Sequence, residues 1–351
     1  MTQNEIIDFM TSLQQPRFRG RQVFSAVYRR GCRGFMEMTD LPLGLRHEMD
    51  QAAEVGMPEV LSRQSAGDGT VKLLMRLQDG STVEAVSMLY RLDRSRDRLT
   101  FCLSSQVGCP IGCPFCATGK SGFVRNLTAG EIVGQALVLL EEAAPGIGDA
   151  EKIGVNIVFM GMGEPLLNLE EVLKAGRLLH DPEGMGISWR RITISTSGVV
   201  PGIRSLMGEG LPINLAVSLH AADNRLRDRL VPINRRYPLE ELIPACREYA
   251  DAGGRRMTFE YVLLPGINDK LEQACQLAEL LAGLPALVNL IPVNPAGEEE
   301  QSGSNPADAK RAREFARVLK GKGIGATIRE GKGGEIMAAC GQLRSREVRE
   351  R

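Results

Sequence analysis

The sequence predicts an α/β protein in which a partial β/α barrel follows a small N-terminal α+β accessory domain. From about residue 99, short β-rich runs alternate with amphipathic helical stretches, which is the pattern of parallel βα units. Before that point, Asp79-Gly80 separates two alternating runs and predicts a β-hairpin. The length of 351 residues accommodates one large core and one smaller unit.

Residues 1–95 are expected to form the accessory domain, in which two helical segments precede a hairpin over 69–89. The second helical segment, 16–34, interleaves arginine with aromatic residues and contains no acidic residue, so its local charge is about +6. Arginines contact phosphate and aromatic rings stack on bases, so this segment is a candidate RNA contact. The candidates are Arg17, Arg19, Arg21, Arg29 and Arg30. An amphipathic surface helix with Phe and Val facing inward explains the same pattern, and both interpretations can hold on opposite faces.

Residues 96–343 are expected to form the barrel core, after a polar connector at 90–98. Its predicted strands are 99–104, 155–160, 191–196, 213–219, 257–264, 287–293 and 325–330. Thr128 and Glu131 form a capping-box pattern that announces the first helix. In such barrels the active site lies at the carboxyl ends of the strands. The loops that follow the predicted strands are therefore where functional residues are sought.

The overall composition favours a cytoplasmic protein. The 43 basic and 43 acidic residues give zero net charge, so any nucleic-acid contact must be a local patch. No apolar run is long enough to cross a bilayer, and the N-terminus lacks the pattern of a signal peptide. The eight cysteines of a long cytosolic chain favour metal or redox chemistry over a disulfide framework. Residues 344–351 form a basic tail.

Cys109, Cys113 and Cys116 lie within eight residues, directly after the first predicted barrel strand. Structural zinc takes four ligands, and a [4Fe–4S] cluster is normally held by four thiolates. Three thiolates would leave one iron free to bind a substrate. The spacing resembles that of the radical S-adenosylmethionine (SAM) superfamily, whose open iron chelates SAM. A zinc knuckle is the alternative, although the ligand count is wrong for a closed site.

The sequence GMGEP, residues 161–165, follows the second predicted strand. Its glycines permit close approach of a ligand, and its carbonyls or Glu164 can accept hydrogen bonds from an ammonium group. It resembles the motif with which radical SAM enzymes bind the amino group of SAM. Short polar residues at other strand ends are candidates for the rest of the cofactor, although local turn bonding is the alternative for each. The candidate SAM contacts are Gly163, Glu164, Ser195, Ser218, Leu219, His220 and Asn294.

A longer set of motifs resembles the RlmN/Cfr family of radical SAM rRNA methyltransferases, over nearly the whole chain from PRFRGRQVF to residue 343. The motifs are CLSSQVGC (102–109), GFVRNLT (122–128), GMGEPLLN (161–168), STSGVVP (195–201), SLH (218–220) and AACGQL (338–343). GMGEPLLN is the form found on the RlmN side of the family. The resemblance implies methylation of adenine C2 in 23S rRNA, with tRNA as a second substrate. Lys120 and Arg125, beside the cysteine motif, are further phosphate candidates.

The resemblance also implies roles for three residues outside the cluster motif. One SAM methylates Cys340, and a second is cleaved to a 5′-deoxyadenosyl radical that activates the S-methyl group for addition to C2. Glu84 then removes the C2 proton, and Cys102 releases the product through a transient disulfide with Cys340. From the residues alone, Cys102 and Cys340 are better explained as buried core thiols, and only the resemblance assigns them to the reaction. Glu84, among Val86 and Met88 on a partly buried strand face, suits proton transfer near neutral pH, with a solvent-facing glutamate as the alternative.

Three other functions fit parts of the pattern. A Cfr-like enzyme would methylate adenine C8 with the same machinery. A glycyl-radical activase would need neither Cys102 nor Cys340, and a non-enzymatic iron–sulfur or zinc RNA-binding protein would need neither GMGEP nor Cys340. Lys332 and Glu335 stand where the family usually has Arg and Asp, which keeps charge but changes the available geometry. We expect a monomer that receives electrons from a flavodoxin- or ferredoxin-type donor.

Overall fold

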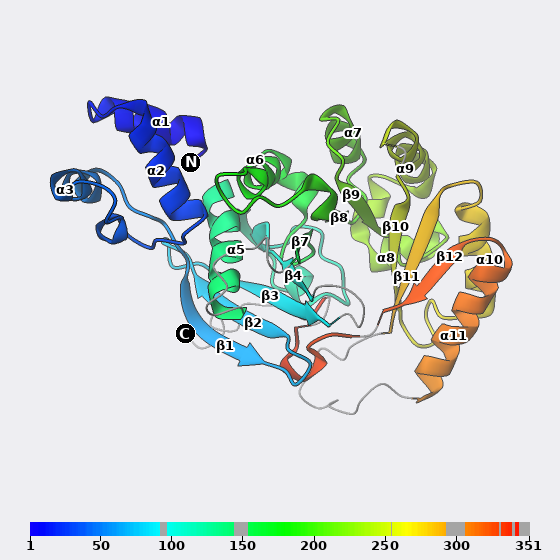
Figure 1. Ribbon diagram of the computed structural model, residues 1–351. Coiled ribbons are helices and arrows are strands. Elements are labelled where there is room, and N and C mark those ends of the chain that lie inside the picture. The colour runs from blue at the N-terminus through cyan, green and yellow to red at the C-terminus, as the bar shows by residue number, and fades with distance from the viewer. Residues whose placement is uncertain are drawn as a thin grey trace.

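The structure is a computed structural model that describes residues 1–91, 97–143, 154–253, 255–292, 306–329, 331–338 and 341–343. Its centre is a ten-stranded sheet in the order β1-β2-β3-β4-β7-β8-β9-β10-β11-β12 (Figure 1). From β4 onward the paired strands are parallel. Among the described residues, no helix is long and apolar enough to cross a membrane.

The parallel part of the sheet confirms the predicted β/α core. Its strands are β4 (Arg98–Cys102), β7 (Gly154–Phe159), β8 (Ile192–Thr196), β9 (Asn214–Ser218), β10 (Met257–Leu263), β11 (Ala286–Pro292) and β12 (Gly325–Ile328). Each overlaps a run predicted from the sequence. The sheet is open, with β1 and β12 at its edges, which agrees with a partial barrel rather than a closed one.

Helices cover the outer side of this sheet (Figure 1). They are α5 (Ala129–Ala143), α6 (Leu169–His180), α7 (Val200–Gly208), α8 (Asn224–Leu230), α9 (Leu239–Gly253), α10 (Leu271–Leu280) and α11 (Pro306–Gly321). The predicted capping box before α5 is confirmed, because Glu131 N donates to Thr128 Oγ1 and Thr128 N donates to the Glu131 carboxylate. The apolar faces of these helices and the strands form one continuous core.

The N-terminal part contains α1 (Gln3–Ser12), α2 (Arg17–Tyr28), α3 (Leu43–Ala52), β1 (Glu59–Ser65), β2 (Val71–Arg76) and β3 (Thr82–Tyr90). The predicted hairpin is confirmed as β2 and β3, joined at Asp79-Gly80. The strands β1–β3 do not form a sheet of their own. Since β3 pairs antiparallel with β4, they extend the sheet of the core, while α1–α3 stand beyond it (Figure 1). The boundary expected near residue 95 falls at 92–96, outside the described residues.

Short elements connect the core to its loops. A two-stranded sheet of β5 (Gln106–Gly108) and β6 (Phe123–Asn126) encloses the cysteine motif, together with α4 (Ala117–Lys120). The turns η2 (Pro165–Leu167), η4 (Pro232–Arg235) and η6 (Gly334–Ile336) follow β7, α8 and β12. The described C-terminal residues end at Leu343, so the basic tail predicted at 344–351 lies outside them.

Candidate active site

Glu84 and Cys102, predicted from the sequence, share one face of β2, β3 and β4 with Lys72, which was not predicted. Val86 on β3 lies opposite Lys72 on β2 and opposite Cys102 on β4. Residues directly opposite in an antiparallel pair point to the same face, and Glu84 shares that face with Val86 because strand side chains alternate. The register therefore places Lys72, Glu84 and Cys102 on one surface. Both faces of β3 are buried, which excludes the solvent-facing alternative for Glu84.

Residues 332–337 of the C-terminal segment lie against β2, β3 and the turn before β2. Lys72 Nζ donates to the carbonyl of Met337 at 3.4 Å, and Lys332 Nζ donates to the carbonyl of Leu89 at 3.0 Å. Gly333 N donates to Asp68, in the turn before β2. Cys340 itself lies outside the described residues, but residues close to it on both sides are held in place. Met337, three residues before Cys340, is therefore held beside the strand pair that carries Glu84.

The same segment also contacts the cysteine loop. Ala117 N donates to the carbonyl of Gly341 at 2.7 Å, and Thr118 Oγ1 donates to the carbonyl of Leu343 at 2.6 Å. Ala117 directly follows Cys116. Gly341 and Leu343, which follow Cys340 in the chain, are therefore held beside the cluster motif. Met337, which precedes Cys340, is held beside Glu84 through Lys72.

Residues 103–106 connect β3 with the GMGEP loop. Ser104 Oγ donates to the carbonyl of Glu84 and accepts a hydrogen bond from Met162 N. Gln106 Oε1 accepts a hydrogen bond from Glu164 N at 2.8 Å. This short segment, between Cys102 and the cysteine motif, thus fixes the GMGEP loop against β3. It explains why residues so far apart in the sequence form one site.

The cysteine motif forms a tight loop around the three thiols. A Cβ at Gly108 would collide with the carbonyl of Gly122, so the loop closes where only glycine fits, with φ of +74°. Burial, with smaller contributions from the neighbouring Glu164 and Cys116 charges, raises the pKa of Cys109 to about 12. Burial likewise raises the pKa of Cys113, with Cys116 and Cys109 adding to the effect. The three thiols thus lie close enough to influence one another.

These thiols fit a multinuclear cluster better than a single ion. The raised pKa values of Cys109 and Cys113 favour their protonated forms in the absence of a metal, whereas a bound cation would deprotonate them. Within the described part of the chain, no three His, Cys, Asp or Glu side chains converge closely enough to hold one metal ion. Three thiols are one ligand short of a closed zinc site, whereas they suit an iron–sulfur cluster with one open corner.

The GMGEP loop presents its backbone rather than a free carboxylate. Glu164 is buried, and its carboxylate accepts hydrogen bonds from Ser197 N, Ser197 Oγ and Leu166 N. Burial raises the pKa of Glu164, while the bonds from Ser197 oppose that rise. Glu164 therefore ties the end of β7 to the end of β8, and the loop carbonyls are the more open acceptors for a cofactor amino group.

The residues after β9 are held by a buried arginine that the sequence interpretation did not include. Arg227, on α8, is fully buried and donates to the carbonyls of Ser197, Ser218 and Leu219. Burial lowers the pKa of Arg227 to about 10, so it stays charged at neutral pH. A charged residue in the LRDRL segment reads as exposed helix surface, so only its strand-end partners identify its role.

His220 is held as a neutral ring beside the cysteine loop. Its φ is +59°, its Nδ1 accepts a hydrogen bond from Val262 N, and burial lowers its pKa to about 3. Its ring lies edge-on to that of Phe115, between Cys113 and Cys116, at 5.0 Å. Ser195 and Ser218 are half-buried on β8 and β9. Asn294 lies outside the described residues.

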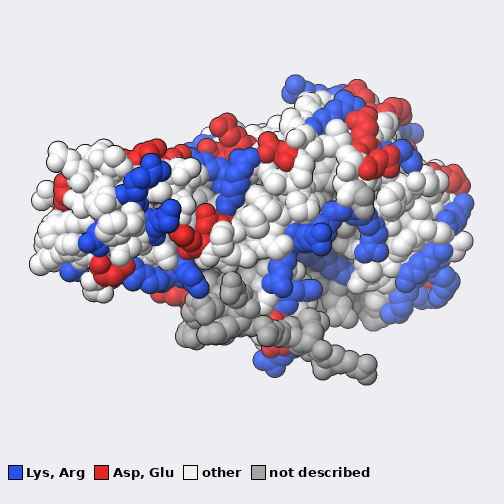
Figure 2. All heavy atoms as spheres, turned by 45° about the horizontal axis from the view of Figure 1, so that its top comes forward, with Lys and Arg blue, Asp and Glu red and all other residues white. Residues whose placement is uncertain are grey.

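Some of the arginines predicted to contact RNA are exposed, whereas others already interact with groups of the protein. Arg17, Arg21 and Arg29 are exposed on α2, while Phe24 and Tyr28 are buried in the core, so the two faces predicted for this helix both exist. Phe18 is 54% exposed and lies under the Arg19 guanidinium at 4.9 Å. Arg30 pairs with Asp40. Figure 2 shows Lys and Arg over these helices with carboxylates among them.

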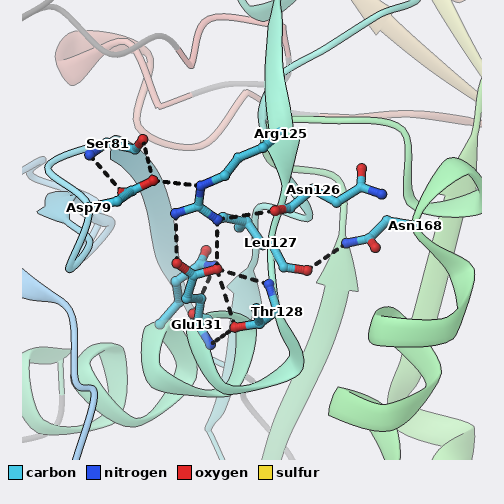
Figure 3. A network of polar contacts seen from close by, with 9 residues as sticks. Asp79, Ser81, Arg125, Asn126, Leu127, Thr128, Glu131 and Asn168 are labelled. Carbon is cyan, nitrogen blue, oxygen red and sulfur yellow. Dashed lines mark hydrogen bonds and ion pairs between the residues drawn. The ribbon is translucent and has the colours of Figure 1, made fainter.

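Arg125 is held between two carboxylates (Figure 3). Its guanidinium contacts Asp79 at 2.7 Å in the β2–β3 turn and both carboxylate oxygens of Glu131 in the capping box. It therefore ties β6 to the hairpin and to α5, and its charge is already balanced. Lys120 is exposed on α4. Of the two candidates beside the cysteine motif, Lys120 is the better placed for phosphate.

Comparison with known proteins agrees with this architecture. Residues 103–278 match the radical SAM superfamily, and residues 1–55 match the ribosomal RNA large subunit methyltransferase N-terminal domain. A protein of Moorella thermoacetica named "Probable dual-specificity RNA methyltransferase RlmN" is 52% identical over 98% of this chain and 96% of its own length. The chain belongs to the RlmN family of radical SAM methyltransferases.

Other RlmN relatives and a solved structure agree along the whole chain. The "Dual-specificity RNA methyltransferase RlmN" of Syntrophobacter fumaroxidans is 47% identical over 97% of this chain and 95% of its own. A crystal structure of a radical SAM methyltransferase from Sphaerobacter thermophilus has a TM-score of 0.90 and 44% identity, covering 98% of each chain. Membership of this family implies SAM and a [4Fe–4S] cluster as cofactors.

Proposed function

We propose that this RNA methyltransferase methylates C2 of an adenosine in 23S rRNA, and of an adenosine in tRNA, by a cysteine-relay reaction. The observation that carries the proposal is the meeting of Glu84, Cys102 and the chain flanking Cys340 on one face of β2–β4, beside the cysteine loop. A simple iron–sulfur RNA-binding protein has no use for this convergence. Adenine C2 is an electron-poor carbon that does not attack a methyl sulfonium by a polar route, so a relay through a second group is chemically required.

Cys109, Cys113 and Cys116 would hold the cluster. SAM would lie against the strand ends that carry Gly163, Glu164, Ser195, Ser218, Leu219, His220 and Asn294. When bound, the two groups would supply the methyl carbon and the one-electron chemistry that activates it. We place the enzyme in the cytoplasm as a monomer, with a flavodoxin- or ferredoxin-type protein as reductant.

The protein's own residues complete the reaction. Cys340 would accept a methyl group and carry it to adenine C2, giving a covalent protein–RNA adduct. The Glu84 carboxylate would take the C2 proton, and the C–H electron pair would stay in the ring. The Cys102 thiolate would then attack the Cys340 sulfur, so that the sulfur–methylene bond breaks as the disulfide forms. The electron pair of the broken bond passes to the methylene carbon, which takes a proton to become the methyl group of the product. Cys102 is buried, which protects it from other thiols until the segment carrying Cys340 meets it.

The RNA would contact two arginine surfaces. The first is the exposed side of α2, with Arg17, Arg19, Arg21, Arg29 and Arg30. The second, the α8–η4 surface, consists of exposed Arg225, Arg229, Arg235 and Arg236. Within the described residues none of these four makes an ion pair, whereas nearby Asp228 and Glu240 accept hydrogen bonds from Asn234 and Asn224. Arg227, on the buried side of α8, donates hydrogen bonds to carbonyls in the predicted SAM loops. The α8–η4 surface therefore lies at the rim of the site.

The deciding experiment is nucleoside mass spectrometry after anaerobic incubation of reduced enzyme with methyl-labelled SAM and protein-free 23S rRNA. 2-Methyladenosine supports the proposal. 8-Methyladenosine would assign the same residues to a Cfr-like reaction, and cleaved SAM without methylated adenosine would refute the RNA position.

Two cysteine variants test the relay. Cys340→Ala is expected to keep cluster and SAM binding and to make no methylated RNA. Cys102→Ala is expected to accumulate the covalent protein–RNA adduct, visible as a shifted band on a denaturing gel. Normal turnover by Cys102→Ala would remove it from the reaction.

A further inference from the structure

Lys72 is a buried lysine to which the proposed reaction gives no role. Its side chain is 7% exposed and its Nζ lies 3.4 Å from Glu84 Oε1, in a carboxylate side chain that is 6% exposed. Lysine is almost never buried this deeply unless it is paired, because an ion loses several kcal/mol of hydration. Hydrophobic residues in the same two positions would make an equally good core, so the pair calls for an explanation beyond packing.

The same ammonium group reaches the segment that carries Cys340. Lys72 Nζ donates to the carbonyl of Met337, three residues before Cys340. Met337 has φ of +49°, a left-handed conformation that is strained for a non-glycine residue and persists where surrounding contacts impose it. The backbone bonds from Met337 N to Gly334 O and from Ala338 N to Gly333 O close the turn. Lys72 thus contacts the proposed base and the strained turn before Cys340 with one group.

We propose that Lys72 is the positioning residue of the proton-removal step: it keeps the Glu84 carboxylate ionised and aimed at the adduct formed on Cys340. This inference rests on the proposed function. The proton passes from adenine C2 to the Glu84 carboxylate, which becomes a neutral carboxylic acid, while the C–H electron pair remains on the ring. Because the transferred proton neutralises the Glu84 carboxylate, the charge attraction between Glu84 and Lys72 is lost at this step.

The test separates this role from a structural one by measuring the adduct. Lys72→Met is expected to keep the cluster, cleave SAM and form the protein–RNA adduct, but to release methyladenosine about 10²-fold more slowly, the size of a lost general base. Lys72→Arg restores much of the release, because the cation is kept. The matched control is Lys174→Met, which breaks an ion pair of Lys174 with Glu5 at 2.7 Å near the surface and leaves release unchanged.

A double-variant cycle keeps the inference falsifiable if Lys72→Met alone is unstable. Lys72→Met/Glu84→Gln removes both charges and leaves no unpaired buried ion, so it folds like other neutral replacements of buried pairs. If Lys72 acts through Glu84, this variant and Glu84→Gln accumulate equal amounts of adduct and release product at equal rates.

Two results overturn the inference. One is wild-type release by Lys72→Met. The other is less adduct in the double variant than in Glu84→Gln, which would place Lys72 before adduct formation or in folding alone. Failure of the proposed function looks different: wild-type enzyme would then make no methyladenosine, and Glu84→Gln would form no adduct.

Discussion

Gly163 shows at the scale of one residue how closely the SAM loop packs on the rest of the site. Its φ is +107°, and a Cβ there would lie 2.7 Å from Gln106 Cβ. Gln106 in turn accepts the hydrogen bond from Glu164 N. The glycine is therefore needed both for its backbone conformation and for the space it leaves.

Gly163→Ala is expected to lower the free energy of unfolding by about 1–3 kcal/mol, from strain and overpacking. It should also weaken SAM binding, because the loop backbone must shift. Urea denaturation and equilibrium dialysis under anaerobic conditions measure the two effects. Gly44→Ala is the matched control: Gly44 lies in the first turn of α3 with no atom near its added Cβ, and alanine favours helix by about 0.5–1 kcal/mol. Equal effects at both positions would contradict the explanation.

Some residues of the site are visible in the sequence and others are not. The spacing of Cys109, Cys113 and Cys116 by itself indicates a cluster motif. The alternation in TVEAVSM places Glu84 on the same strand face as Val86 and Met88. Lys72 and Arg227 are different, because charged residues in strands and helices ordinarily face water. Their burial depends on partners far away in the chain, Glu84 and Met337 for Lys72, and the ends of β8 and β9 for Arg227. Periodicity carries no signal for such contacts.

At the scale of elements, Arg125 connects three of them. It links β6, the turn at Asp79 and the capping box of α5 through Glu131. Its hydrogen bond to Asp79 holds the pKa of that carboxyl well below its usual range. The folded state therefore favours the Asp79 anion, and this stabilisation is present above pH about 4 and is lost as pH falls through the lowered pKa.

Arg125→Gln is expected to lower the free energy of unfolding by about 1 kcal/mol at pH 7, as for a partly exposed ion-pair network. The difference from wild type should shrink as pH falls from about 4 toward the lowered pKa of Asp79, because Asp79 gains its proton first in the unfolded chain and in the variant. RNA affinity and its salt dependence should not change. A variant of unchanged stability that binds RNA more weakly would return Arg125 to the phosphate contacts.

The α8–η4 surface gives a quantitative prediction for RNA binding. Arg225→Gln/Arg229→Gln should weaken RNA binding and lower the slope of log K against log[salt] by about 1–2, since each lost phosphate contact removes about 0.7–0.9. Arg313→Gln/Arg317→Gln is the matched control, with two exposed arginines at the same spacing on α11. Equal loss in both double variants would mean that only total charge matters.

Elements with strong local signals were predicted well, and those made by distant pairing were not. Each barrel strand coincides with an apolar β-rich run, and α5 begins at its capping box. β1 is mostly exposed and polar, and β5 and β6 have three and four residues, so none carries a periodic pattern. They exist because β2 and the cysteine loop supply partners, which the local sequence does not show.

At the scale of the whole molecule, the C-terminal segment connects the N-terminal strands with the barrel. Lys332 contacts the carbonyl of Leu89, the ring of Tyr90 at 5.1 Å and Asp68 at 4.0 Å, while Gly341 and Leu343 bond to the cysteine loop. The resemblance could place Cys340 in the reaction from the sequence. Only the fold shows that its segment is held at one end by a turn that lies about 260 residues earlier in the chain.

Asp68→Asn tests whether this anchoring is needed for turnover. Asparagine keeps a side-chain oxygen that accepts the hydrogen bond from Thr70 N and so shapes the turn. It loses the negative charge beside Lys332 and weakens the hydrogen bond from Gly333 N. Segment 331–338 should then exchange its amide hydrogens about 10-fold faster, as for the loss of roughly 1.4 kcal/mol of local stability.

Cluster content and SAM binding should stay at wild-type levels, since their predicted contacts lie on the barrel. Methylation should fall in the same proportion if the proposed reaction needs residues 331–338 to be held beside the strands that carry Glu84. Lys332→Arg, which keeps the charge, is the matched control and should retain protection and activity. If Asp68→Asn exchanged faster and methylated normally, the anchored state would be a resting arrangement, and the reaction would proceed from the released segment.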